Sequence, residues 1–327
     1  MRTRTLSGPR PSAPPTAPKG AAAGADRPRP VRHRLAERVA PYTYIAPFFL
    51  LFAVFGLFPL LFTFYIALFD WNPIGDRTFI GFDNFTRLWE DGRFWNATRN
   101  TLSIWFLSTV PQLLAALLLA HLLNHARLRF SGFFRMTMLV PYITSVAATT
   151  IVFAQMFDRD YGLLNWLLGL VGIGPINFLQ STGASHVMIA TMVAWRWFGY
   201  TTLLYLASLQ AIPRETYEAA AVDGAGGVKQ FWHITIPSLR PIIIFTVVTS
   251  TIGGLQIFTE PLLAGRATPL TCGPTRECQT LTLFLYEQGF GGYEFGYAAA
   301  IGVALFAMIV VIALINYLLS TRIRSER

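Results

Sequence analysis

Three acidic residues, Glu215, Glu218 and Asp223, stand in a polar stretch between two long apolar segments. The spacing suits one short helix, whose dipole favours carboxylates near its N-terminus. This connection, residues 213–237, spends about 25 residues where helix–helix loops usually take roughly 2 to 8. The excess predicts a recognition element rather than a simple turn.

The small residues of this stretch define its shape. Ala219 and Ala220 combine high helix propensity with almost no bulk. Gly224 is the residue type that usually follows a helix end, and Pro213 suits an early helical position. A second short helix, residues 228–236, is expected after the turn at Gly224, and Pro237 should end it. We predict a slim helix that enters a cleft on a partner protein; an ordinary amphipathic interfacial loop is the alternative.

A second group of chemically capable residues lies inside an apolar segment. Arg196 stands about ten residues from the outer end of that segment, and ionisable groups at such depth usually face a bundle interior or a wet cavity. Trp197 and Tyr200, three residues apart, share a helix face. Aromatic rings with polar edges suit a sugar, which presents apolar C–H faces and hydroxyls. Packing of the tryptophan against lipid or other helices is the alternative.

The following apolar segment offers a matching face. Thr249, Gly253 and Gln256 recur at helical spacing, and Glu260 follows near the outer end. The glycine opens room and the glutamine offers both a donor and an acceptor. These residues predict the other wall of a substrate path, with close helix packing through small residues as the alternative for Thr249 and Gly253.

The chain has two cysteines, Cys272 and Cys278, separated by a Gly-Pro turn. If their loop faces the oxidising side of a membrane, a disulfide is expected. Two thiols without a nearby histidine are too few ligands for a metal, so no metal site is predicted.

The sequence contains no phosphate-binding G-x-x-x-x-G-K-[ST] loop and no H-E-x-x-H motif. No paired catalytic carboxylates or Ser/His/Asp set occupies a plausible site either. We therefore expect a non-enzymatic chain that binds no cofactor of its own.

Composition indicates a membrane protein, since 53% of the residues are hydrophobic and 13% are charged. Each crossing needs about 20 apolar residues. An all-α fold with six transmembrane helices in one domain, residues 39–327, is predicted. The predicted spans are residues 42–68, 99–123, 133–156, 186–212, 239–262 and 297–320.

Residues 1–38 are rich in Arg, Pro and Ala and lack apolar periodicity, which predicts a disordered basic tail. Lys and Arg are more frequent on the side that carries this tail, the 213–237 loop and the C-terminus. The positive-inside rule then places both termini and that loop in the cytoplasm of a cell-membrane protein. A tail on the cytoplasmic side of a membrane protein is usually basic for this topological reason, so no nucleic-acid partner is predicted; binding of nucleic acid or anionic lipid by the tail is the alternative.

The 213–237 loop resembles the EAA loop of permease subunits of bacterial ABC importers, most closely the sugar-importing branch with the maltose and glycerol-phosphate permeases. The resemblance extends from about residue 40 to the end. It rests on Glu218-Ala219-Ala220, Asp223-Gly224-Ala225, Ile234, Pro237 and Pro241, with Trp195 to Tyr200 and Leu209 to Pro213 beside them.

This resemblance implies a type I importer fold and an ATP-driven mechanism. It implies a second homologous permease, a dimeric ATP-binding cassette ATPase that holds ATP and Mg, and an extracytoplasmic sugar-binding protein. The coupling residues would be Glu215, Glu218, Ala219, Ala220, Asp223 and Gly224. The substrate residues would be Trp197, Tyr200, Thr249, Gly253 and Gln256.

The expected cargo is a disaccharide or oligosaccharide, and Gly253 to Pro261 resembles permeases for cellobiose and related β-glucosides. A different class of function is an ion-coupled secondary transporter of a small polar solute. That mechanism would call for buried mid-span carboxylates and an internal inverted repeat, and neither is evident in the sequence.

Overall fold

The structure is a computed structural model that describes residues 31–73, 75–125, 131–266 and 268–325. The chain divides into two compact units, Met1–Phe58 and Pro59–Arg327, which are described separately. The predicted basic tail lies outside the described residues up to residue 30. Residues 31–38 belong to the helix α1 (Val31–Phe52), which therefore begins before the predicted boundary.

The described residues of the first unit form α1 and the π-helical turn η1 (Ala53–Leu57), followed by Phe58. Its described side chains are exposed and largely apolar, as expected of a surface that meets lipid. The second unit begins at Pro59, within α2 (Phe58–Ile66). A short antiparallel hairpin, β1 (Phe69–Trp71) and β2 (Arg77–Phe79), precedes α3 (Asp83–Glu90).

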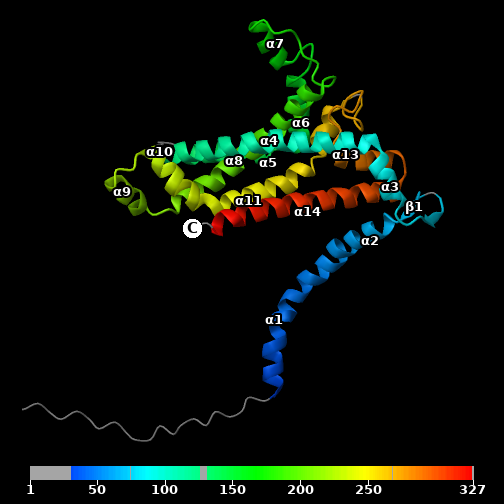
Figure 1. The fold of residues 1–327 in the computed structure, drawn as a ribbon, viewed down its shortest axis with the longest axis horizontal. Coiled ribbons are helices and arrows are strands. Elements are labelled where there is room, and N and C mark those ends of the chain that lie inside the picture. The colour runs from blue at the N-terminus through cyan, green and yellow to red at the C-terminus, as the bar shows by residue number, and fades with distance from the viewer. Residues whose placement is uncertain (1–30, 74, 126–130, 267, 326–327) are drawn as a thin grey trace, which may run out of the picture. The chain divides into compact units, whose positions relative to one another are not determined.

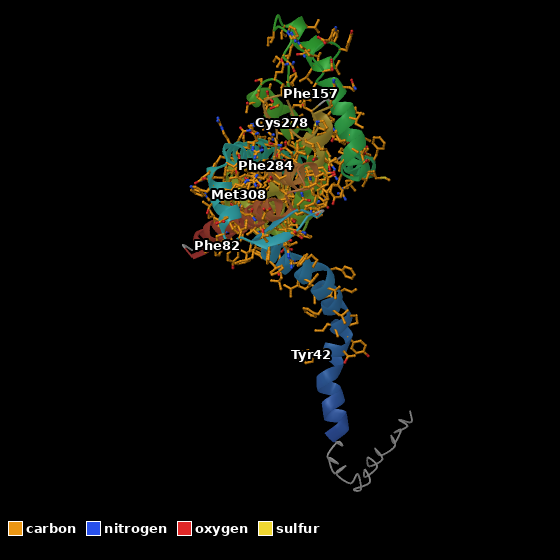
Figure 2. All side chains as sticks on the ribbon, turned by 90° about the vertical axis from the view of Figure 1, so that its right-hand side faces the viewer. Tyr42, Phe82, Phe157, Cys278, Phe284 and Met308 are labelled. Atoms are coloured by element: carbon orange, nitrogen blue, oxygen red, sulfur yellow. A yellow bond between two sulfur atoms is a disulfide. The ribbon has the colours of Figure 1, made fainter. Side chains whose placement is uncertain are left out.

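The body of the second unit is formed by four long helices: α4 (Gly92–His125), α8 (Thr182–Gln210), α11 (Ile236–Leu255) and α14 (Phe295–Ser325). Figure 1 shows α4, α11 and α14 running side by side, with α8 against α4. One cluster of the core contains Phe157 and Cys278, and another contains Phe284 with Met308 packed against it (Figure 2). The long helices thus pack against one another through buried side chains rather than standing as isolated spans.

Helix α8 covers the predicted fourth span but differs from the other spans in composition. Within the described ranges, four helices are long and apolar enough to cross a membrane: Tyr42–Ile66, Gly92–Asn124, Gly227–Leu255 and Phe295–Leu318. A bent pair makes a fifth if it is counted as one span. Helix α8 buries polar residues such as His186, Thr201 and Thr202 among its neighbours. The prediction of six spans is therefore not confirmed as six. Helix α8 packs many of its side chains, polar ones included, against other helices, and such a helix needs less apolar character than one that meets lipid all round.

The predicted third span, residues 133–156, is broken rather than straight. It consists of α5 (Ser131–Ile143) and α6 (Val146–Met156), which meet at an angle of 91°. The break lies at Thr144–Ser145, whereas Pro141 remains inside α5. Helix α5 approaches α8 closely, since a Cβ added to Gly199 would lie 1.8 Å from the Met138 carbonyl oxygen.

The predicted fifth span, residues 239–262, begins and ends earlier than expected. Helix α10 (Gly227–Gln230), the π-helical turn η2 (Phe231–Thr235) and α11 run together as one span, Gly227–Leu255. The prediction that Pro237 ends a separate helix is wrong, because proline is tolerated in the first turn of α11. The helix ends before Gln256, and α12 (Thr259–Ala264) follows as a separate element.

The remaining helices are short. Helix α9 (Arg214–Val222) connects α8 to α10, and α7 (Leu163–Leu170) follows α6. Helix α13 (Leu281–Tyr286) continues into η3 (Glu287–Gly291) ahead of α14. Figure 1 places α9 at one end of the long helices and α13 with α3 at the other, and α14 finishes at the α9 end.

Candidate functional site

The predicted slim helix is α9, which projects from one end of the bundle. The helix starts at Arg214, so Pro213 precedes it rather than occupying its first turn. Gly224 follows the end of the helix with φ +78°, a left-handed conformation that costs glycine little. The Ala225 N–H donates to the Ala220 carbonyl at 2.8 Å and closes the turn.

Most of the predicted coupling residues are on the surface of α9 and the turn after it. Ala220 is half-buried, and Val222 beside it is 88% exposed. An exposed helix with acidic residues and so little side-chain bulk has the shape expected of an inserting element. The exposed members are Glu215, Glu218, Ala219, Asp223 and Gly224.

Two contacts that could not be inferred from the sequence join α9 and the turn after it to the next span. The Tyr217 hydroxyl lies 3.0 Å from the Thr235 hydroxyl in η2. The Gln230 side-chain amide donates to the Ala225 carbonyl at 2.9 Å. Polar residues spaced along a loop gave no signal of these pairings, which depend on how the chain folds back after Gly224.

A cavity of about 220 Å³ lies inside the bundle, between α4, α8, α11, α12 and the start of α6. Six of the seven cavity candidates named from the sequence line it, and they come from α8, α11, α12 and the link between α11 and α12. They are Arg196, Trp197, Thr249, Gly253, Gln256 and Glu260.

Tyr200 is the candidate that the lining does not include. Its ring stacks on Tyr142 of α5, with ring centres 4.7 Å apart. Tyr142 also meets the Trp197 ring edge-on at 5.3 Å. Tyr200 therefore supports the wall of the cavity from behind, through an aromatic partner that the sequence reasoning did not single out.

Helix α4 supplies a polar side of the cavity through Ser108, Thr109 and Gln112. The Gln112 amide donates to the Thr201 hydroxyl at 2.8 Å and so links α4 to α8. A glutamine beside Pro111 in an apolar span was the signal that could have identified this side. The hydrogen bond from Gln112 to Thr201 could not be predicted, because it depends on the pairing of α4 with α8.

The two adjacent glycines of α11 serve different purposes. A Cβ added to Gly254 would lie 2.5 Å from Cδ1 of Trp105, so Gly254 allows α11 to pack against α4. A Cβ added to Gly253 would meet nothing within 4 Å. Gly253 faces the cavity, and its small size keeps that space open.

The two charged candidates lie beside each other in the lining of the cavity. A terminal nitrogen of Arg196 lies 3.9 Å from a carboxylate oxygen of Glu260. Nε of Arg196 is buried and has no hydrogen-bond partner within the described part of the chain. The pairing of α8 with α12 that this requires could not be predicted from the spacing of the two residues.

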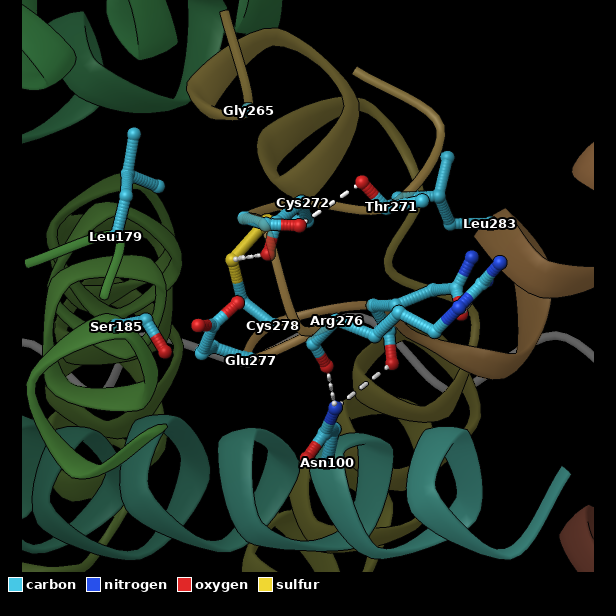
Figure 3. Close-up of a disulfide and its surroundings, with 12 residues drawn as sticks. Asn100, Leu179, Ser185, Gly265, Thr271, Cys272, Arg276, Glu277, Cys278 and Leu283 are labelled. Atoms are coloured by element: carbon cyan, nitrogen blue, oxygen red, sulfur yellow. Dashed lines mark hydrogen bonds between the residues drawn. A yellow bond between two sulfur atoms is a disulfide. The ribbon is translucent and has the colours of Figure 1, made fainter. Parts of the chain in front are cut away.

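The loop between α12 and α13 is closed by a disulfide between Cys272 and Cys278 (Figure 3). Both cysteines are buried. The Asn100 amide donates to the carbonyls of Arg276 and Gln279 at 2.9 and 3.1 Å, which fixes the loop on α4.

His186 of α8 joins the same region. Its Nδ1 lies 2.9 Å from the Ser103 hydroxyl, and its Nε2 lies 3.0 Å from the Glu277 carbonyl oxygen. Helices α4 and α8 and the disulfide loop thus form one hydrogen-bonded layer, at the end of the bundle away from α9.

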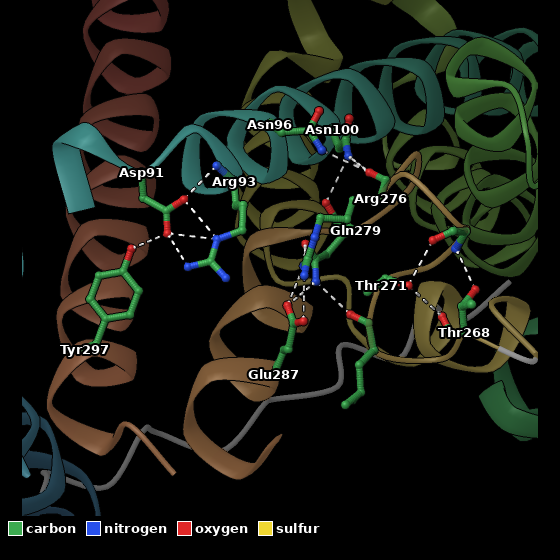
Figure 4. Close-up of polar contacts among 12 residues, drawn as sticks. Asp91, Arg93, Asn96, Asn100, Thr268, Thr271, Arg276, Gln279, Glu287 and Tyr297 are labelled. Carbon is green, nitrogen blue, oxygen red and sulfur yellow. Dashed lines mark hydrogen bonds and ion pairs between the residues drawn. The ribbon is translucent and has the colours of Figure 1, made fainter. Parts of the chain in front are cut away.

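Two ion pairs complete this layer (Figure 4). Arg276 binds Glu287 through two nitrogens, at 2.5 and 2.8 Å, and Asp91 accepts from Arg93 and from the Tyr297 hydroxyl. Burial alone would raise the pKa of the Glu287 carboxyl, but hydrogen bonds from Arg276 and Gln279 hold the pKa below its ordinary value. Among the described residues, no group of three His, Cys, Asp or Glu could hold a metal ion.

Comparison with known proteins gives a consistent picture. Residues 101–325 match the family model described as "Binding-protein-dependent transport system inner membrane component". The chain is 38% identical to the lactose transport system permease protein LacF of Rhizobium radiobacter over 279 residues, which is 84% of this chain and 92% of LacF. It is 34% identical to the arabinooligosaccharides transport system permease protein AraP of Bacillus subtilis, over 89% of this chain and 91% of AraP.

The fold also matches a solved structure. A chain in the crystal structure of a bacterial alginate ABC transporter, in complex with an alginate pentasaccharide-bound periplasmic protein, superposes with a TM-score of 0.76 at 23% identity. The match covers 89% of this chain and 97% of that one. These findings show that the chain belongs to the family of inner membrane components of binding-protein-dependent transport systems.

Proposed function

We propose that this chain is a permease subunit of an ATP-driven sugar importer, and that the cavity between α4, α8, α11 and α12 is its share of the sugar path. The observation that carries the proposal is the composition of that cavity. Trp197 offers an aromatic face, while Thr249 and Gln256 offer hydroxyl and amide groups. Sugars are held by this combination of apolar stacking and hydrogen bonding.

The cargo that fits best is a disaccharide or oligosaccharide, with cellobiose and other β-glucosides as candidates. Relatives named for lactose and for arabinooligosaccharides support this size class. A cavity of about 220 Å³ is below the roughly 300–1,000 Å³ of typical ligand pockets. That size is consistent with a path completed by a second permease subunit.

The partners follow from the same proposal. A dimeric ATPase supplies ATP and Mg and receives α9 in a cleft, an external sugar-binding protein delivers the cargo, and a second homologous permease lies alongside in the bilayer. Both termini and α9 then face the cytoplasm of a multi-pass cell-membrane protein. The exposure of α9 and its small residues support this docking.

The family membership favours this mechanism over an ion-coupled secondary transporter. Uptake of labelled disaccharides by cells that express the full importer separates the two mechanisms. We expect uptake to survive an ionophore that collapses ion gradients while ATP is maintained, and to stop when ATP is depleted. Uptake that stops with the ionophore at constant ATP would contradict the proposal.

A further inference from the structure

The cavity lining is neutral except for one oppositely charged pair. Among the described residues that line it, Arg196 and Glu260 carry the formal charges, and the others are apolar, hydroxyl or amide side chains and glycines. The side chains of the pair are only 22% and 10% exposed. At such burial the two charges interact more strongly than they would in water.

The pair is close, but it is not a direct hydrogen bond. A separation of 3.9 Å exceeds hydrogen-bonding distance, and Nε of Arg196 is buried without a partner among the described residues. At this separation the terminal nitrogens of Arg196 make no hydrogen bond to Glu260, so the guanidinium keeps donors for a hydroxyl oxygen or a water in the cavity. The carboxylate of Glu260 can likewise accept from a hydroxyl.

The position of Glu260 limits what Arg196 can bind. A lone guanidinium in such a cavity would attract a carboxylate or sulfonate, since bidentate pairing with anions is its strongest interaction. With Glu260 beside it, an anionic ligand would meet a like charge at the same place. An uncharged sugar would meet no such repulsion.

We propose that the Arg196–Glu260 pair makes the cavity selective for uncharged sugars, by cancelling a positive charge that would otherwise accept anionic ones. This inference rests on the proposed function and specifies its substrate class. Proteins with this fold are associated with both neutral and acidic sugars. LacF is named for lactose, a neutral sugar, whereas a solved structure with this fold belongs to an importer of the acidic polysaccharide alginate.

The local charge can be measured without knowing the cargo. The two native cysteines are joined in a disulfide, so a Gly253→Cys substitution adds a free thiol where the added Cβ meets nothing within 4 Å. In the assembled importer, this thiol is titrated with methanethiosulfonates that carry either a sulfonate or a trimethylammonium group. The ratio of the two labelling rates reports the electrostatic potential at the thiol. A change in the accessibility of the thiol alters both rates by the same factor and therefore leaves the ratio unchanged.

We expect E260Q to raise the sulfonate-to-ammonium rate ratio about tenfold and R196Q to lower it by a similar factor. The double variant should return to the starting ratio, because it restores neutrality. A ratio unchanged in both single variants would overturn the inference, even if either variant assembles poorly.

Protection of the same thiol by sugars tests the selectivity. With the pair intact, millimolar lactose, maltose or cellobiose should slow labelling and digalacturonate should not; in E260Q digalacturonate should also protect. Equal protection by digalacturonate with the pair intact would overturn the inference. A rate ratio that responds as expected, while no sugar protects any variant, would instead overturn the proposed sugar path and the selectivity role with it.

Discussion

At the scale of single residues, the cavity depends on groups chosen for size as much as for chemistry. Gly253 and Gly254 both line the cavity, yet a Cβ added to Gly253 would meet open space and one added to Gly254 would meet Trp105 of α4. Sequence reasoning named Gly253 as a cavity residue, but it could not separate the roles of the two glycines. The difference depends on which side of α11 meets α4.

Gly253→Leu should block sugar uptake, because the new side chain starts in cavity space where an added Cβ meets nothing within 4 Å. Its effect on thermal unfolding should be small, since glycine is itself unfavourable in a helix by roughly 0.5–1 kcal/mol. Gly254→Ala is the matched control. Its Cβ would clash with Trp105, which should destabilise the bundle by about 1–3 kcal/mol. The reverse pattern would show that Gly253 does not face the path.

Glu287 gives a prediction for the dependence of stability on pH. Its pKa is lower in the folded protein than in the unfolded chain, so the folded protein binds fewer protons. The stabilisation is complete above the ordinary value of 4.5 and is lost as the pH falls through the lower, folded pKa. Glu287→Gln should cost on the order of 1–3 kcal/mol at pH 7.

The difference in unfolding temperature between Glu287→Gln and the parent should therefore shrink as the pH is lowered from 6 towards 3. Glu90→Gln is a control, because Glu90 is exposed on α3. If the difference in unfolding temperature stays constant over this range, the Glu287–Arg276 ion pair does not account for the loss of stability at low pH.

At the scale of elements, α9 is attached to both helices that carry the cavity candidates. It follows α8 directly, and Tyr217 and Gln230 fasten it to the turn that begins the next span. Deeper in the bundle, the Tyr205 hydroxyl of α8 lies 2.8 Å from the Thr246 hydroxyl of α11. A displacement of α9 by a partner would therefore act on both walls of the cavity.

Glu218→Lys should reduce ATP-driven uptake at least tenfold, because it reverses a charge on the exposed face of α9. The amount of the variant in the membrane should not change, since no described residue buries that side chain. Glu90→Lys reverses a charge at the opposite end of the bundle and should leave coupling to ATP hydrolysis intact. Normal uptake by Glu218→Lys would contradict a docking role for α9.

At the scale of the whole molecule, local patterns identified the helices better than their breaks. The slim helix and its Gly224 stop were predictable because capping signals are local. The sharpness of the bend after Ile143 and the end of α11 before Gln256 were not, because an apolar run of the right length looks the same whether it is straight or broken. The cavity residues came from facing spans, but their partners on α4 required the packing itself.

The central claim is that α9 seats in a separate ATPase subunit. The direct measurement replaces Val222, exposed on α9, with the photocrosslinker p-benzoylphenylalanine and illuminates membranes that contain the full importer. Leu170, exposed on α7, receives the same replacement as the control. We predict a crosslinked product that contains this chain and the ATPase from position 222 and none from position 170. Uptake-competent membranes in which position 222 never crosslinks to the ATPase would contradict the claim.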